Sequence, residues 1–324
     1  MPRVKVLFHD NCFDGAASAA LFSRFYAERI DDSATFAFAG KNHGTGNVYS
    51  ESSFDGDVNA VVDFRYSSDP RLGWWFDHHV SAFPTPADEQ HFKANPSPHK
   101  FFDPTRRSCT KYLADMCRQQ FGWDWSAHEE LVRWADIIDG AQFESPRAAV
   151  ELAEPALQLM TWVENNQDPQ LKLRFIEDLL SQPLANMAAA PYVTDALAPI
   201  LEKHKRGIDV VRARATYAAG VVSFDVADDG LDVYNKFIPY FLFPDCHYVV
   251  GVSLTPTRAK VSVGSNPWAS ARRTVNIAEL CERYGGGGHP VVGAVSLATG
   301  DLPRARQAAA EIAETLRQAA PKER

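Results

Sequence analysis

Three apolar runs near the amino terminus each stop at acidic or imidazole side chains. The runs are RVKVLFHD (residues 3–10), VNAVVDFRY (58–66) and WWFDHH (74–79). A segment rich in small residues, 14–30, follows the first run and is typical of a packed helix. Strands that alternate with helices form parallel βαβ units, whose functional groups gather at the carboxyl ends of the strands. The sequence therefore predicts an α/β fold with a parallel amino-terminal sheet and a site at one sheet edge.

The rest of the chain predicts a helical middle and a second α/β region. Helices are expected at 109–122, where Gly122 is a stop signal, at 126–142, and as a long helix at 193–217. After residue 218 the expected elements are strands at 220–226, 247–256 and 259–265, a helix at 275–284, a strand at 290–297 and a carboxyl-terminal helix. At 324 residues, two domains are expected. We predict a catalytic domain at 1–195, a helical linker at 196–217 and a smaller domain at 218–324.

Bulk composition excludes several classes of protein. The apolar runs fall short of the roughly 20 residues that span a bilayer, so no membrane segment is expected and the cytoplasm is the expected location. Five scattered cysteines without a Cys-x-x-Cys pair indicate neither a disulfide framework nor a zinc ribbon. A formal charge of −8 disfavours binding of long duplex DNA, which depends on a basic face.

The acids and imidazoles near the strand ends are candidates for a single metal centre. They are His9, Asp10, Asp14, Asp63, Asp77, His78 and His79, with Asp136 and Asp139 in the segment ADIIDGAQF. Each has an ordinary explanation alone, such as a turn cap or a solvated charge, but adjacent Asp-His-His after a buried run is harder to explain as a surface turn. Mixed carboxylate and imidazole ligands suit Mn²⁺, with Mg²⁺, Fe²⁺ or Co²⁺ as alternatives. One or two such ions would support phosphoester or phosphoanhydride hydrolysis.

The second candidate site is the glycine cluster GGGGHP, residues 285–290. A single glycine would end the preceding helix, but four cost much backbone entropy. Close approach of bare backbone N–H groups to a phosphate is one reason to accept that cost. A flexible linker is the alternative, although the apolar segment that follows resembles a strand.

FDHH and YGGGGHPVVGA, in this order and about 200 residues apart, resemble the two motifs of the DHH/DHHA1 phosphoesterase family. The resemblance covers nearly the whole chain. It implies a parallel-sheet DHH domain with a divalent-metal centre, usually Mn²⁺, and a smaller α/β DHHA1 domain that holds the substrate. Members include single-strand exonucleases, nanoRNA and nucleoside-bisphosphate hydrolases, cyclic-dinucleotide phosphodiesterases and pyrophosphatases.

The resemblance also implies residue roles. His9, Asp14, Asp63, His78 and Asp139 correspond to metal ligands, with Asp63 bridging and Asp136 as the alternative to Asp139. His79 would contact the scissile phosphate or the leaving oxygen, and Asp77 would orient His78. Gly286, Gly287, Gly288 and His289 would bind a substrate phosphate.

Two positions depart from the family pattern. Cys12 stands where the first motif has an aspartate, so Asp10 or Asn11 would compensate, or Cys12 would act as a soft ligand. Gly264 stands where many nucleotide-cleaving relatives have an arginine before a serine. Arg258, Arg272 and Arg273 are the candidates for the missing charge.

The leading hypothesis is a metal-dependent phosphoesterase acting on short oligonucleotides, dinucleotides or nucleoside bisphosphates. A pyrophosphatase or short-chain polyphosphatase is the second hypothesis. A nucleotide-binding protein with a degraded centre is the third. The sequence leaves open whether the protein forms a homodimer.

Overall fold

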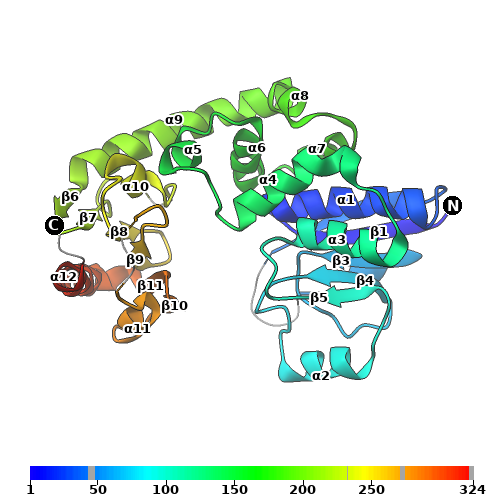
Figure 1. Cartoon of the computed structure of the whole chain (residues 1–324), viewed down its shortest axis with the longest axis horizontal. Helices are drawn as coiled ribbons and strands as arrows, with labels where there is room; N and C mark the ends of the chain where they lie inside the picture. Colours follow the sequence, from blue (N-terminus) through cyan, green and yellow to red (C-terminus); the bar gives the residue numbers. More distant parts are fainter. Residues whose placement is uncertain (43–47, 232, 271–273, 321–324) are drawn as a thin grey trace. The chain divides into compact units, whose positions relative to one another are not determined.

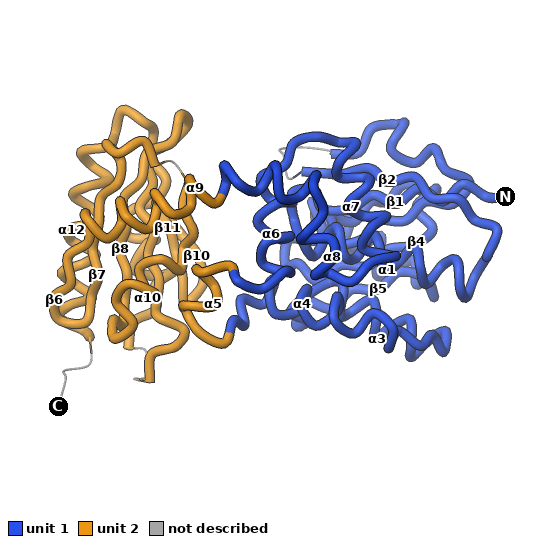
Figure 2. The backbone as a smooth tube through the Cα atoms, turned by 90° about the horizontal axis from the view of Figure 1, so that it is seen from above, with its two compact units in different colours: residues 1–143, 153–200 blue, residues 144–152, 201–324 orange. Residues whose placement is uncertain are grey.

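The computed structural model describes residues 1–42, 48–231, 233–270 and 274–320. Contacts divide the chain into two compact units, 1–143 with 153–200, and 144–152 with 201–324 (Figure 2). The short segment 144–152 groups with the second unit because Asn235 donates a hydrogen bond to the Ala149 carbonyl and Val150 is buried in that unit's core. The domain ranges expected from the sequence stay a prediction.

A parallel sheet of five strands forms the first unit, in the order β2-β1-β3-β4-β5 (Figure 1). The strands are β1 (Arg3–His9), β2 (Thr35–Lys41), β3 (Val58–Val62), β4 (Leu72–Asp77) and β5 (Lys100–Phe102). The predicted α/β class is confirmed, and the three apolar runs form strands β1, β3 and β4. The outer strands β2 and β5 were missed, because β2 is only half-buried along its length and β5 has three residues.

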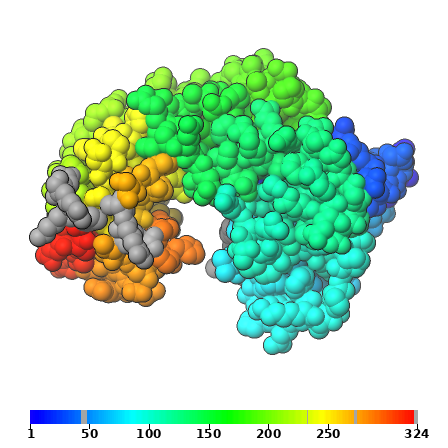
Figure 3. Space-filling view, viewed as in Figure 1, coloured from blue at the N-terminus to red at the C-terminus, as the bar shows by residue number. Residues whose placement is uncertain are grey.

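Helices cover this sheet, with α1 at the centre of the packing. Helix α1 contacts β1, β3, α3, α4, α6 and α7, and its small residues let these neighbours approach closely. The helices of this unit are α1 (Phe13–Arg29), η1 (Glu51–Phe54), α2 (Pro86–Ala94), α3 (Cys109–Phe121), η2 (Ser126–His128), α4 (Glu129–Asp139), α6 (Pro155–Asn165), α7 (Pro169–Ser181) and α8 (Leu184–Ala188). Helix α2 buries none of its residues and lies on the surface (Figure 3). Helix α9 (Pro191–Arg214) continues from the first unit into the second.

The two tryptophans of β4 explain why an apolar run leads to the Asp-His-His sequence. Trp75 is fully buried on one face of the sheet, where it packs against Tyr66 and Phe92. Trp74 is buried on the other face against Phe22 and Phe25 of α1. A parallel strand covered on both faces needs apolar residues at consecutive positions. The apolar run therefore anchors β4, and Asp77, the last residue of this strand, lies at the carboxyl edge of the sheet.

The second unit contains a mixed sheet of six strands in the order β10-β11-β9-β8-β7-β6, in which only the β7–β8 pair is parallel among the described residues. Its elements are α5 (Pro146–Glu151), β6 (Thr216–Ala218), β7 (Val221–Asp225), α10 (Ile238–Leu242), β8 (Tyr248–Leu254), β9 (Ala259–Ser265), α11 (Ile277–Glu282), β10 (Gly287–His289), β11 (Val292–Leu297), η3 (Thr299–Asp301) and α12 (Leu302–Ala319). Part of the glycine cluster is itself a strand, β10. No helix in the described part of the chain is both long and apolar enough to cross a bilayer.

Candidate metal centre

The register of the parallel sheet brings three chain segments to one level. Phe8 of β1 pairs with Val62 of β3, and Val62 pairs with Phe76 of β4. The next residue in each segment is His9, Asp63 or Asp77, so all three lie at the same carboxyl edge. A shift of one residue in this register would turn these side chains to the opposite face.

Asp63 lies at the centre of this edge with its side chain fully buried. Its Oδ2 atom is 3.5 Å from Nδ1 of His9, and its Oδ1 atom is 3.4 Å from Nε2 of His78. The backbone of Asp63 has a φ of +56°, the left-handed conformation that few residues other than glycine adopt. Its N–H donates a hydrogen bond to the Phe76 carbonyl. Such backbone strain commonly accompanies functional positions.

A second group of ligand atoms surrounds Nε2 of His78. Besides Asp63, this nitrogen lies 3.4 Å from Oδ2 of Asp139, the last residue of α4, and 3.8 Å from Oδ2 of Asp14 in α1. The other ring nitrogen, Nδ1, is 3.1 Å from the carbonyl oxygen of Arg106, which accounts for the orientation of the imidazole. One imidazole thus faces three carboxylates, from α1, from α4 and from the residue that follows β3.

Asp14 is positioned by the first turn of α3, a contact that the sequence analysis missed. Its two carboxylate oxygens accept hydrogen bonds from the backbone N–H groups of Cys109 and Thr110, at 2.7 and 3.0 Å. The positive end of the helix dipole stabilises an anion there. The N-cap, Ser108, was a usable signal, because it marks where the unpaired N–H groups of α3 begin.

These distances and the buried polar atoms fit a divalent cation. The separations of 3.4–3.8 Å exceed the usual hydrogen-bond range of about 2.7–3.2 Å. Among the described residues, both carboxylate oxygens of Asp63 and Nε2 of His78 are buried without a hydrogen-bond partner. Such atoms are costly unless something else, such as a cation, satisfies them. His9, Cys12 and Asp63 form one candidate ligand group, Asp63, His78 and His79 a second, and Asp14, His78 and Asp139 a third.

The clustered charges shift the ionisation of the ligands. Burial raises the pKa of Asp14 and, with the charge of Asp63, raises that of Asp139 to about 6. Burial alone would also raise the pKa of Asp63, but the imidazoles of His78 and His9 outweigh it and lower the pKa to about 2. For His78, burial acts to lower the pKa, and the surrounding carboxylates overcome it and raise the pKa to about 10. Without a cation, a proton on His78 partly balances the acids.

The loop between β1 and α1 shows which first-motif side chains face the centre. The carboxylate of Asp10 accepts a hydrogen bond from Nζ of Lys172 at 2.7 Å, and the side-chain oxygen of Asn11 accepts another from the same atom at 2.7 Å. Asp10 is in no ligand group of the described structure, whereas Cys12 lies with His9 and Asp63. Burial and the nearby acids, Asp63 first, raise the pKa of the Cys12 thiol.

Asp77 contacts His79 rather than the His78 ring that it was expected to orient. Oδ1 of Asp77 lies 2.8 Å from Nδ1 of His79 and accepts the backbone N–H groups of His78 and His79. Burial acts to lower the pKa of His79, but Asp77 and Asp63 outweigh it and raise the pKa. Asp136 is likewise engaged elsewhere, since it accepts a hydrogen bond from Ser108 and lies outside the ligand groups found among the described residues.

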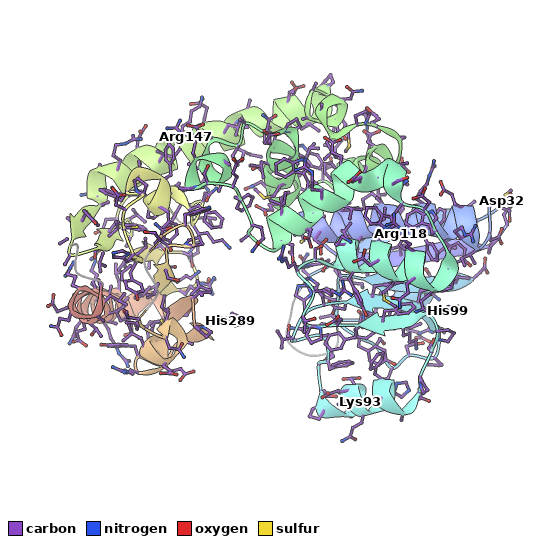
Figure 4. All side chains as sticks on the ribbon, viewed as in Figure 1. Asp32, Lys93, His99, Arg118, Arg147 and His289 are labelled. Carbon is purple, nitrogen blue, oxygen red and sulfur yellow. The ribbon has the colours of Figure 1, made fainter. Side chains whose placement is uncertain are left out.

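In the second unit, packing accounts for part of the glycine cluster. A Cβ atom at Gly286 would lie 2.2 Å from the Ala294 carbonyl oxygen, and one at Gly288, whose φ is +152°, would lie 2.3 Å from that of Val292. These glycines let β10 approach β11. Gly287 has no atom within 4 Å of the position that a Cβ would take, and His289 is exposed at the end of β10 (Figure 4).

Arg258, one of the arginines expected to supply a charge near Gly264, lies at the opposite end of β9 from it. Gly264 pairs with Val292 beside the glycine hairpin, whereas Arg258 lies in the turn where Ala259 pairs with Leu254 and Leu297, at the other end of β9. Arg272 and Arg273 lie outside the described residues.

The chain matches no protein-family model and no curated protein. Its fold is similar to solved structures. A pGpG-specific phosphodiesterase, PggH from Vibrio cholerae, matches with a TM-score of 0.66 and 18% identity over 96% of this chain and 99% of that one. The DHH domain of a member of the s1p family of ribosomal proteins matches with a TM-score of 0.56 and 13% identity, over 97% of this chain and 87% of that one. RecJ from Thermus thermophilus in complex with Mn²⁺ matches with a TM-score of 0.50 and 11% identity, over 99% of this chain and 53% of that one.

At these identities the likeness concerns the fold. It confirms the predicted fold, a parallel-sheet α/β domain followed by a second α/β domain.

Proposed function

We propose that this chain is a divalent-metal-dependent phosphoesterase that hydrolyses phosphodiester or phosphomonoester bonds of short oligonucleotides, dinucleotides or nucleoside bisphosphates. The observation that carries the proposal is the environment of Asp63. Its buried carboxylate lies between the imidazoles of His9 and His78, and both of its oxygens lack a hydrogen-bond partner among the described residues.

The proposed metal ligands are the residues whose donor atoms converge at this edge: His9, Asp14, Asp63, His78 and Asp139, with Cys12 beside His9 and Asp63. Oxygen and nitrogen donors of this kind suit Mn²⁺, with Mg²⁺, Co²⁺ or Fe²⁺ as alternatives. When bound, such an ion stabilises the charge that develops on a phosphoryl group and makes a water molecule more acidic.

His79 is the proposed proton donor. The Asp77 carboxylate at Nδ1 fixes the ring and favours its protonated form, so Nε2 can carry a proton for the leaving oxygen. Asp77 itself is fully buried. It thus acts through His79 and through the turn after β4. The rate enhancement expected from one such general acid is about 10²–10⁴-fold.

Three observations support a short nucleotide substrate. The fold is similar, over nearly the full length of both chains, to a phosphodiesterase named for its specificity toward pGpG. The charge of −8 offers little attraction for a long polyanion. Gly287, which has open space at its Cβ position, and the exposed imidazole of His289 also suit binding of one phosphate group.

The test compares hydrolysis of pApA, a ribo-trinucleotide, a nucleoside bisphosphate and tripolyphosphate with Mn²⁺. We expect turnover of one or more of the nucleotides and little of tripolyphosphate. Asp63→Asn should reduce both metal binding and turnover by more than roughly 100-fold. Changing a residue that only hydrogen-bonds to a metal ligand already costs up to about 100-fold, so changing a ligand itself should cost more. Asparagine tolerates the left-handed backbone, so this variant should stay folded.

The matched control is Asp32→Asn, at an exposed aspartate of the same unit (Figure 4). It should keep full activity. Undiminished turnover in folded Asp63→Asn would refute the proposal. Selective turnover of tripolyphosphate would support the pyrophosphatase hypothesis instead, and ligand binding without turnover with any divalent ion would indicate a nucleotide-binding protein.

A further inference from the structure

We propose that Cys12 is a thiolate ligand of a divalent cation held with His9 and Asp63, and that this position prefers thiophilic ions, Zn²⁺ foremost, over Mn²⁺ and Mg²⁺. The inference rests on the proposed function, because it concerns the same centre. It adds that the centre contains two chemically different positions, one with sulfur and one with oxygen and nitrogen alone.

The geometry places the thiol within reach of such an ion. Ligand atoms of His9, Cys12 and Asp63 all lie within 4.8 Å of one another. The first turn of α1 packs tightly onto the end of β1, since a Cβ at Gly15 would lie 2.1 Å from the His9 carbonyl oxygen. This close approach brings Cys12 beside His9. Cys12 is the N-cap of α1, but its side chain makes no capping hydrogen bond.

The buried carboxylate of Asp63 is the independent sign of a ligand here. Its side chain is fully buried, and neither of its oxygens has a hydrogen-bond partner in the described part of the chain. Oδ2 faces His9 and Oδ1 faces His78, so the carboxylate lies between the two positions. A carboxylate placed in this way can serve both ions of a two-metal site.

The alternatives to Cys12 in this loop are engaged elsewhere. Nζ of Lys172 lies 2.7 Å from Oδ1 of Asp10 and 2.7 Å from the side-chain oxygen of Asn11, and Lys172 is itself buried. Moving either side chain to the metal would remove one of the two acceptors of a buried ammonium, which is costly. Cys12 therefore supplies the loop's remaining donor beside His9 and Asp63.

Ligand softness then sets metal preference. Thiolates select Zn²⁺ and other thiophilic ions, whereas carboxylates suit Mg²⁺ and Mn²⁺. The group of His9, Cys12 and Asp63 contains one ligand of each kind, sulfur, nitrogen and oxygen. The group of Asp14, His78 and Asp139 contains none with sulfur. The first position should bind Zn²⁺ or Co²⁺ tightly, and the second should exchange Mn²⁺ or Mg²⁺ more readily.

Cobalt spectroscopy of the full chain tests this assignment without an activity assay. Titration with Co²⁺ should produce a near-ultraviolet sulfur-to-cobalt charge-transfer band that saturates at one ion per chain. Cys12→Ser should abolish the band. Cys109→Ser is the matched control, because the Cys109 thiol is also buried near the centre but donates to the Phe76 carbonyl, and it should keep the band. Cys12→Asp should lower the preference for Zn²⁺ over Mn²⁺ by roughly tenfold or more.

A second measurement needs no variant. Alkylation of Cys12 by iodoacetamide, followed by peptide mass spectrometry, should slow at least tenfold when Zn²⁺ is added. A cobalt complex without the band, a full band in Cys12→Ser, or unchanged alkylation would overturn the inference. Loss of these signals with intact, Asp63-dependent hydrolysis would leave the proposed function standing. If the cobalt band forms but no substrate is hydrolysed, the Cys12 assignment would stand and the proposed function would fail.

Discussion

Oδ1 of Asp77 lies 2.8 Å from Nδ1 of His79 and also accepts the backbone N–H groups of His78 and His79. One buried carboxylate therefore holds both the turn after β4 and the ring of the second histidine. The first histidine is oriented separately, through the Arg106 carbonyl. The three residues of the Asp-His-His sequence therefore have different hydrogen-bond partners.

Asp77→Asn should lower kcat by roughly 10–100-fold, the loss typical of partners that orient a reacting group, with metal affinity nearly retained. The asparagine oxygen can still accept the two backbone N–H groups, but the charge beside His79 is lost. The pKa of His79 should fall, because Asp77 raises it in the native protein. NMR titration of His79 and the pH–rate profile check this expectation.

The same shift has a defined sign for stability. A histidine whose pKa is raised on folding stabilises the protein fully below its unfolded pKa and loses that contribution as pH rises through the folded pKa. The wild-type protein should therefore exceed Asp77→Asn in stability by more at pH 6 than at pH 9. Equal differences at both values, measured by urea unfolding, would contradict the assigned role.

Lys172→Met should destabilise the first unit by about 1–3 kcal/mol, the scale of hydrogen bonds to charged groups. The Lys172 side chain is 10% exposed and pairs with Asp10, which is 18% exposed, so solvent screens the pair little. Lys93→Met is the control, because Lys93 is 68% exposed and pairs with Glu89 on the surface helix α2 (Figure 4). That change should cost no more than about 0.5 kcal/mol. If the two substitutions lower the free energy of unfolding in urea equally, Lys172 does not anchor the loop between β1 and α1.

Gly286→Ala and Gly287→Ala should separate packing from substrate binding. At Gly286 the added Cβ meets the Ala294 carbonyl oxygen at 2.2 Å, so we expect a loss of roughly 1–3 kcal/mol in stability. At Gly287 it meets no atom within 4 Å, so stability should change by less than about 0.5 kcal/mol. If Gly287 approaches a substrate phosphate, its variant should raise KM several-fold with kcat retained. An unchanged KM would remove Gly287 from the substrate site.

Metal binding should release protons. In the absence of a cation the pKa of His78 is raised to about 10 and that of Asp139 to about 6, so at neutral pH the His78 imidazole holds a proton that a metal must displace. Affinity should rise with pH between 6 and 8, by about tenfold per unit for each proton released. Calorimetry in buffers of different ionisation enthalpy measures directly how many protons are released when the metal binds. A binding enthalpy that does not depend on the buffer would contradict the prediction.

Local sequence determined the elements that carry strong periodicity or strong stop signals. The apolar runs predicted β1, β3 and β4, and Gly122 ends α3 in the left-handed conformation. The pattern also predicted that acids and imidazoles would meet at one sheet edge, because parallel strands align their carboxyl ends. The motifs FDHH and GGGGH pointed to the fold that the solved structures confirm.

Tertiary structure alone decided which of these side chains face one another. Asp10 and Cys12 are two residues apart, yet Lys172 engages the first while the second lies with His9 and Asp63. Asp136 and Asp139 are one helical turn apart, yet only Asp139 reaches His78. These outcomes depend on partners more than a hundred residues away in the first case and on the packing of α3 against α4 in the second. Sequence spacing specifies the face of an element, whereas side-chain contacts depend on the neighbour that packing places opposite it.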